Sequence, residues 1–149
     1  MTPLIKIQKQ DIDVATEMAA LTGRSGDVGA VATFTGHVRA DNGLTALTLE
    51  HYPAMTEREI ARHVGEAEKR WPLLGVTIIH RIGRLTPSAR IVFIAVAASH
   101  RQAAFEACEY LMDYLKVHAP FWKQEERGGM AVWAEAKPSD DDAAKRWKK

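Results

Sequence analysis

The feature that constrains this chain most is an apolar run that leads directly into a long amphipathic segment. Residues 90–98, RIVFIAVAA, are nearly all apolar, which predicts a central strand with both faces covered. The stretch from Ser99 to Ala119 then repeats apolar residues at helical spacing, which predicts a central helix with one stripe against a core. We expect Ser99 to cap this helix with Gln102 completing a capping box, and Pro120 to end it. A strand-to-helix junction is a common location for ligand sites.

Charged residues at both ends of this helix are not explained by packing. His100 and Arg101 lie in the first turn, where the helix dipole already presents positive charge, so we expect them to share an anion. Lys116 lies beside the apolar stripe and Lys123 follows the proline. Two ammonium groups held close and partly desolvated would favour the neutral form that serves as an acid, base or nucleophile. The plainer alternatives are solvated lysines and an arginine paired with a carboxylate.

The length of the helix separates these two ends. Arg101 and Lys116 are 15 residues apart, which is about 22 Å on a straight helix. They cannot contact one small substrate within one chain. Either they serve separate sites, or two copies of the helix lie antiparallel across a twofold axis and each pocket takes residues from both chains. We favour the second hypothesis because it gives both ends a shared substrate.

Composition argues against several classes of function. A net charge of +1 over 149 residues gives no bulk attraction to nucleic acid or to an anionic membrane, and the basic tail around Trp147 is a weak nucleic-acid footprint. The single cysteine, Cys108, falls on the apolar face of the helix, so we expect a buried hydrophobe. The six histidines lack metal-ligand spacing, so we expect no metal. Without a signal core or a membrane span, we expect one cytoplasmic domain over residues 1–149.

The rest of the pattern predicts an α+β domain of hairpins with helices interspersed. Besides the strand at 90–98, strands are expected at residues 4–9 (an edge strand), 28–39, 44–52, 76–82 and from 130 onward, with helices through 21, from 56 and in the tail. Asp41-Asn42-Gly43 is expected to join two strands as a hairpin with Arg39 at its mouth.

Capping and loop signals complete this prediction. Asp11 or Asp13 is expected to cap the first helix, and Thr56 with Glu59 to form a capping box for the second. A turn is expected around Pro87-Ser88, and a flexible loop at residues 125–129. The glycine-rich segment TGRSGDVG lacks the spacing and the lysine of a phosphate-cradling motif, so we expect a mobile connection there rather than a nucleotide site.

Six separated blocks resemble the large, catalytic subunit of molybdopterin synthase. In chain order they are GAVATFTGHVR, LTLEHYPAMTE, VTIIHRIGRL, SHRQAAFEA, MDYLKVHAPFWKQE and AAKRW. The resemblance implies an α/β hammerhead-type domain with an additional antiparallel sheet. It implies a homodimer that binds a small ubiquitin-like sulfur carrier, making a heterotetramer. It also implies sulfur transfer from the carrier's C-terminal Gly-Gly thiocarboxylate onto cyclic pyranopterin monophosphate (precursor Z), which forms the dithiolene of molybdopterin with no metal or organic cofactor.

Motif positions carry the family's functional residues onto this chain. The resemblance assigns catalysis to Lys116 and Lys123. It assigns substrate binding to residues of three segments, namely His37, Val38, Arg39, His100, Arg101, Gln124 and Glu125. Apolar residues placed to wall a groove for the carrier's tail, or else to pack in the core, are Phe34, Met112, Phe121 and Trp122. Ala54 stands where the family usually has glycine. Alternatives to this enzyme are a Schiff-base lysine and a noncatalytic dimeric binding module for a phosphorylated ligand.

Overall fold

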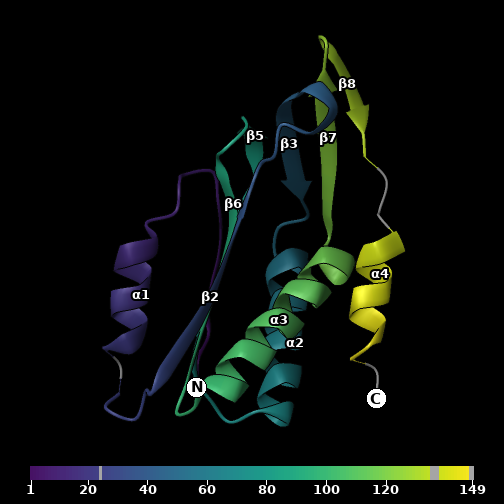
Figure 1. The fold of residues 1–149 in the computed structure, drawn as a ribbon. Coiled ribbons are helices and arrows are strands. Elements are labelled where there is room, and N and C mark those ends of the chain that lie inside the picture. The colour runs from purple at the N-terminus through teal and green to yellow at the C-terminus, as the bar shows by residue number, and fades with distance from the viewer. Residues whose placement is uncertain (24, 135–137, 148–149) are drawn as a thin grey trace.

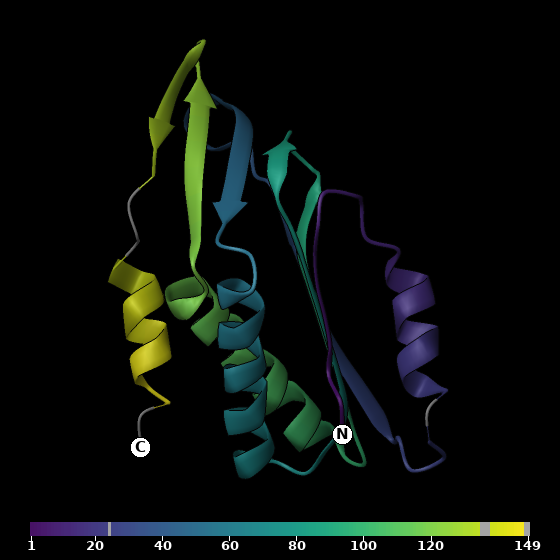
Figure 2. The same cartoon turned by 180° about the vertical axis from the view of Figure 1, so that it is seen from behind.

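The computed structural model describes residues 1–23, 25–134 and 138–147, and it shows an α+β fold (Figures 1 and 2). This confirms the predicted fold class. In chain order the elements are β1 (Leu4–Gln8), α1 (Val14–Thr22), β2 (Ala30–His37), the short 3₁₀ turn η1 (Asp41–Gly43), β3 (Leu44–His51), α2 (Met55–Arg70), β4 (Leu73–Arg81), β5 (Gly83–Leu85), β6 (Arg90–Ala98), α3 (Arg101–His118), β7 (Phe121–Arg127), β8 (Met130–Trp133) and α4 (Pro138–Lys145).

The first sheet is built around β6, as its apolar sequence predicted. Its strand order is β1-β4-β6-β2, with β6 antiparallel to both neighbours and β1 parallel to β4 at one edge. Figure 1 shows α1 on one side of this sheet and α2 and α3 on the other. Residues on both faces of β6 are fully buried, because one face contributes to the core under α2 and α3 and the other to the core under α1.

The second sheet is antiparallel, and it extends beyond the C-terminal end of α3 (Figure 1). Its strand order is β5-β3-β7-β8, and β7 and β8 form a hairpin through Gly128 and Gly129, both at positive φ. The flexible loop expected at residues 125–129 is therefore wrong, since β7 continues to Arg127. The charged run is held as a strand by pairing with β3 and by ion pairs such as Arg84–Glu126. Tertiary pairing outweighs the low strand propensity of glutamate.

The hairpin expected at residues 41–43 is also wrong. β2 pairs with β6 in the first sheet, whereas β3 pairs with β5 and β7 in the second. The segment does turn tightly, because Asn42 and Gly43 take the positive φ values that asparagine and glycine tolerate. Local turn chemistry predicted the change of direction, but it could not predict which strands would pair.

Neither capping box forms. The residue that precedes α3 is His100, whose side chain makes no capping hydrogen bond within the described residues, and Gln102 instead donates to Glu106. Helix α2 begins at Met55 and the residue in the cap position is Ala54, two residues before the predicted cap, so Thr56 lies inside the helix and donates its hydroxyl to the carbonyl of Tyr52. Both motifs identified a helix start to within two residues, but they did not identify the capping contact.

The C-terminal segment docks on α3. Trp147 packs edge-on against Trp71 and Tyr110 and donates its indole N–H to Asp113 at 2.7 Å. Arg146 donates to the same carboxylate. The described part of the basic tail therefore serves packing. The described residues contain no helix that could span a membrane and no cluster of three potential metal ligands. Residues 135 and 136 of the expected last strand lie outside the described residues.

Candidate active site

A cavity of about 680 Å³ lies between the two sheets, beside the C-terminal end of α3. Residues of β2, β3, β4, β6, α3 and β7 line it, together with the connection from β2 to β3. Its lining mixes apolar side chains with cationic ones. The cavity thus forms where the chain passes from the first sheet to the second.

Both lysines predicted as catalytic line this cavity. Lys116 lies in the last turn of α3 and Lys123 in β7. Pro120 stops the helix just after His118, and the chain reverses into β7, which pairs with β3. This reversal brings Lys123 back to the helix end that carries Lys116. Lys116 is exposed and Lys123 half-buried, so the cavity is open to solvent at Lys116 and the catalytic role of the pair stays a prediction.

The end of β2 supplies the residues predicted around the arginine. His37, Val38 and Arg39 all line the cavity. His37 contacts the Ser88 carbonyl oxygen through Nδ1 at 3.0 Å, while the exposed Arg39 donates to Asp41 at 2.7 Å. The side chain of Val38 is buried in a small core, so it shapes the cavity wall rather than presenting a polar group. Arg39, whose side chain is 78% exposed, is the permanent cation of this segment.

The alternation of strand β7 decides which of its residues face the cavity. Phe121, Lys123 and Glu125 line it, as expected for residues two apart on one face of a strand. Glu125 also accepts an ion-pair contact from Arg127. The described lining does not include Gln124, whose predicted role in substrate binding stays a prediction.

Three of the four predicted groove residues form apolar wall. Phe34, Met112 and Phe121 line the cavity. Trp122 is not among the described lining residues and packs against the Tyr52 ring at 4.7 Å between centroids, so its place in the groove stays a prediction. A one-residue step along a strand moves a side chain to the opposite face, which accounts for the difference from Phe121 and Lys123.

His100 and Arg101 lie at the far end of α3 from the cavity. Both are exposed, and the described cavity lining does not include them. The helix is continuous from Arg101 to His118, so the separation of its two ends follows the prediction from its length. Within one chain these residues are not part of the lysine site.

His80, which the sequence did not single out, forms part of the cavity lining at the end of β4. Its ring is 8% exposed and stacks on Phe121 at 3.9 Å between centroids. Its Nδ1 lies 2.8 Å from the carbonyl oxygen of Arg81. The pKa of His80 is lowered to about 4, mainly by burial and to a smaller extent by the positive charges of Lys123 and Lys116. The only signal in the sequence was a histidine ending an apolar strand, and that pattern does not tell which element it faces.

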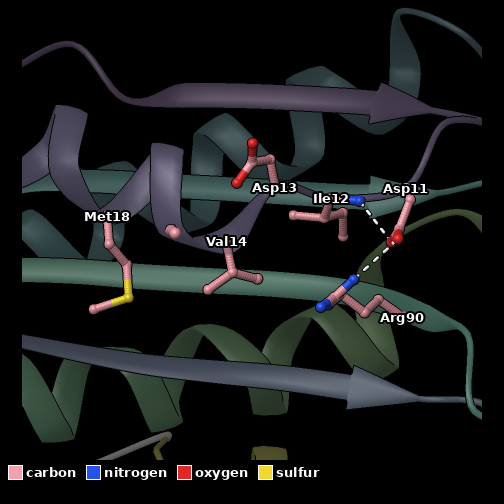
Figure 3. Close-up of a pocket in the computed structure, with 7 residues that line it drawn as sticks. Asp11, Ile12, Asp13, Val14, Met18 and Arg90 are labelled. Carbon is pink, nitrogen blue, oxygen red and sulfur yellow. Dashed lines mark hydrogen bonds and ion pairs between the residues drawn. The ribbon is translucent and has the colours of Figure 1, made fainter.

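A second hollow, of about 630 Å³, lies at the start of α1 (Figure 3). The carboxylate of Asp11 accepts hydrogen bonds there from the Ile12 backbone N–H at 2.7 Å and from Arg90 at 2.9 Å, and both contacts lower its pKa. Asp13 caps α1 by accepting from Thr16, which confirms one of the two predicted caps. Asp11 therefore ties the start of α1 to the first sheet, while Asp13 caps the helix itself.

Sequence comparison identifies the family of this chain. The family described as MoaE protein matches residues 7–118. The chain belongs to the MoaE family. A Mesorhizobium japonicum molybdopterin synthase catalytic subunit is 56% identical to this MoaE chain over 99% of the chain and 95% of the relative. The Escherichia coli molybdopterin synthase catalytic subunit is 52% identical over 96% of the chain and 97% of the relative.

Structure comparison agrees with this identification. The molybdopterin biosynthesis MoaE protein from Burkholderia ambifaria matches with a TM-score of 0.87 at 46% identity, over 98% of both chains. These matches confirm the predicted family, that of the molybdopterin synthase catalytic subunits of molybdenum cofactor biosynthesis, and with it the enzyme class. The roles of individual residues in this MoaE chain are a separate question, which rests on the cavity.

Proposed function

We propose that this MoaE-family chain transfers sulfur from the C-terminal thiocarboxylate of a small ubiquitin-like carrier onto precursor Z, in the cavity that contains Lys116 and Lys123. The observation that supports this is the convergence of the two lysines, from α3 and from β7, in one partly apolar cavity. Two amines beside a cavity wall suit a reaction that develops negative charge on a carbonyl oxygen. The thiocarboxylate sulfur replaces an oxygen substituent on a substrate carbon, which gives a thioester between carrier and substrate. Water then hydrolyses this thioester, so that the sulfur stays on the substrate and the carrier leaves as a carboxylate.

The two lysines have separate roles in this proposal. Lys116 faces the carrier's terminal glycine and stabilises the oxyanion that forms when the acyl carbon is attacked. Lys123 donates a proton or anchors the substrate. The apolar wall of Phe34, Met112 and Phe121 accommodates the extended tail of the carrier, whose Gly-Gly end has no side chains to obstruct a narrow groove.

The phosphate of the substrate is bound by charge-assisted hydrogen bonds. Arg39 lies at the mouth of the cavity, with its guanidinium engaged by Asp41 and able to exchange to a phosphate oxygen. His100 and Arg101 reach the site from a second copy of this chain, because the helix places them away from the cavity of their own chain. The working assembly is then a homodimer with one carrier on each copy.

Reconstitution with a thiocarboxylated carrier and precursor Z tests the proposal. We expect Lys116→Ala and Lys123→Ala each to reduce product formation by roughly 100-fold or more, since removing one oxyanion donor has this effect in other enzymes. Both variants should remain folded and dimeric. Lys69→Ala is the matched control, because this lysine is exposed on α2, pairs with Glu66 and is not among the described cavity residues.

Two outcomes would replace the proposal with an alternative. Trapping of Lys116 by borohydride with substrate alone, without the carrier, would indicate Schiff-base chemistry. Unchanged product formation in both lysine variants would refute the catalytic assignment and leave a binding role for the cavity.

A further inference from the structure

The hydrogen bond made by His80 determines which of its ring nitrogens carries a proton. A carbonyl oxygen is only an acceptor, so the 2.8 Å contact between Nδ1 and the Arg81 carbonyl requires a proton on Nδ1. Burial keeps the ring neutral at pH 7, because it lowers the pKa of His80 to about 4. The second nitrogen, Nε2, therefore carries a lone pair and can only accept.

Lys123, from strand β7, lines the same cavity as His80. The His80 ring stacks on Phe121 at 3.9 Å and 17° between ring planes, and Lys123 is two residues further along the same face of β7. The charged and titratable groups that act on His80 come from three elements: Lys123 from β7, Lys116 from α3 and His51 from β3, in decreasing order of effect. Lys123 is thus the cation whose field His80 experiences most strongly.

We propose that His80 is a positioning residue for sulfur transfer, whose Nε2 accepts a hydrogen bond from the Lys123 ammonium and directs its remaining N–H groups toward the substrate. The inference rests on the proposed function of Lys123. The role is that of an acceptor and not of a base: with a pKa of about 4, the imidazole is too weak to take a proton from an ammonium group at neutral pH. Its effect is on geometry, which catalytic groups require to within a fraction of an ångström.

Two substitutions separate the acceptor from the packing of the ring. His80→Asn keeps a donor near Nδ1 for the Arg81 carbonyl but has no atom at the Nε2 position, whereas His80→Gln places an amide oxygen there. In the reconstituted assay we expect His80→Asn to lower kcat roughly 10- to 100-fold, the effect of losing one hydrogen bond to a charged group, with KM little changed. We expect His80→Gln to recover most of this loss.

His63→Asn is the matched control, because His63 is also buried with a pKa lowered to about 4 but packs between α2 and α3 against Tyr114. Its kcat should stay within about twofold of the wild type. Wild-type turnover in a folded His80→Asn variant, or equal losses in the Asn and Gln variants, would overturn the inference, because only packing would then matter.

Nitrogen NMR of the imidazole tests the contact without any turnover. In the wild-type chain we expect the Nδ1–H tautomer at pH 7, and an Nε2 resonance that shifts in Lys123→Met but much less in Lys116→Met. An Nε2 resonance that does not respond to Lys123→Met would overturn the inference. If the lysine variants keep full activity but the Nε2 shift is observed, the proposed function fails and the contact stands, so the two failures are distinguishable.

Discussion

Replacing Ala54 with glycine should stabilise this protein. Ala54 has φ 66° and ψ −45°, and the Met55 N–H donates to the Pro53 carbonyl at 2.8 Å, so the three residues form a tight γ-turn immediately before α2. A residue with a Cβ is strained at these angles, while glycine adopts them freely.

The change in the free energy of unfolding caused by Ala54→Gly follows from two opposing effects. Holding a non-glycine residue in such a conformation costs about 1–3 kcal/mol, and the substitution removes that strain. Glycine gives the unfolded chain extra conformational freedom, which returns about 0.5–1 kcal/mol. We therefore expect Ala54→Gly to raise the free energy of unfolding by about 1 kcal/mol.

Urea unfolding at one fixed protein concentration is the suitable assay, because the stability of an oligomer depends on concentration. The control is Ala61→Gly, the same substitution at an exposed position inside α2. It should lower the free energy of unfolding by about 1 kcal/mol, so that the two variants lie about 2 kcal/mol apart. Equal destabilisation by both would show that the turn at Ala54 is not strained and would refute the reasoning.

Two further stability changes should be measurable. Gly29→Ala should lower the free energy of unfolding by about 2 kcal/mol, since the added Cβ would lie 2.2 Å from the Ser99 carbonyl oxygen. Gly26→Ala is the control, because a Cβ there lies in open space and should change urea unfolding little. Burial lowers the pKa of His63 from 6.5 to about 4, so the unfolded chain binds this proton first and stability is lost as pH falls from 6.5 toward 4. Between pH 7.5 and pH 5, the free energy of unfolding of His63→Phe, measured with urea, should therefore fall by about 2 kcal/mol less than that of the wild type. Equal decreases in the two proteins would contradict this.

Several features of the molecule were readable from the sequence because they depend on local chemistry. The apolar run of β6 predicted a buried central strand, and apolar spacing predicted α3 almost to its ends. The buried position of Cys108 also followed from that spacing, and burial raises the pKa of its thiol to about 11. Helix length alone predicted that Arg101 and Lys116 would not share a site in one chain. Blocks of residues in the right order indicated the family.

Partner choice between strands could only be seen in the tertiary structure. The turn at residues 41–43 was visible in the sequence, but β2 and β3 enter different sheets, because pairing depends on surfaces assembled from distant segments. Pairing with β3, a distant segment, also makes β7 a strand despite its charged residues, and Trp122 of this strand packs against Tyr52. The tertiary structure also brings His80 against Phe121, from strands far apart in the chain. The sequence thus predicted candidate site residues from local chemistry and from resemblance, while the tertiary structure decided which residues meet.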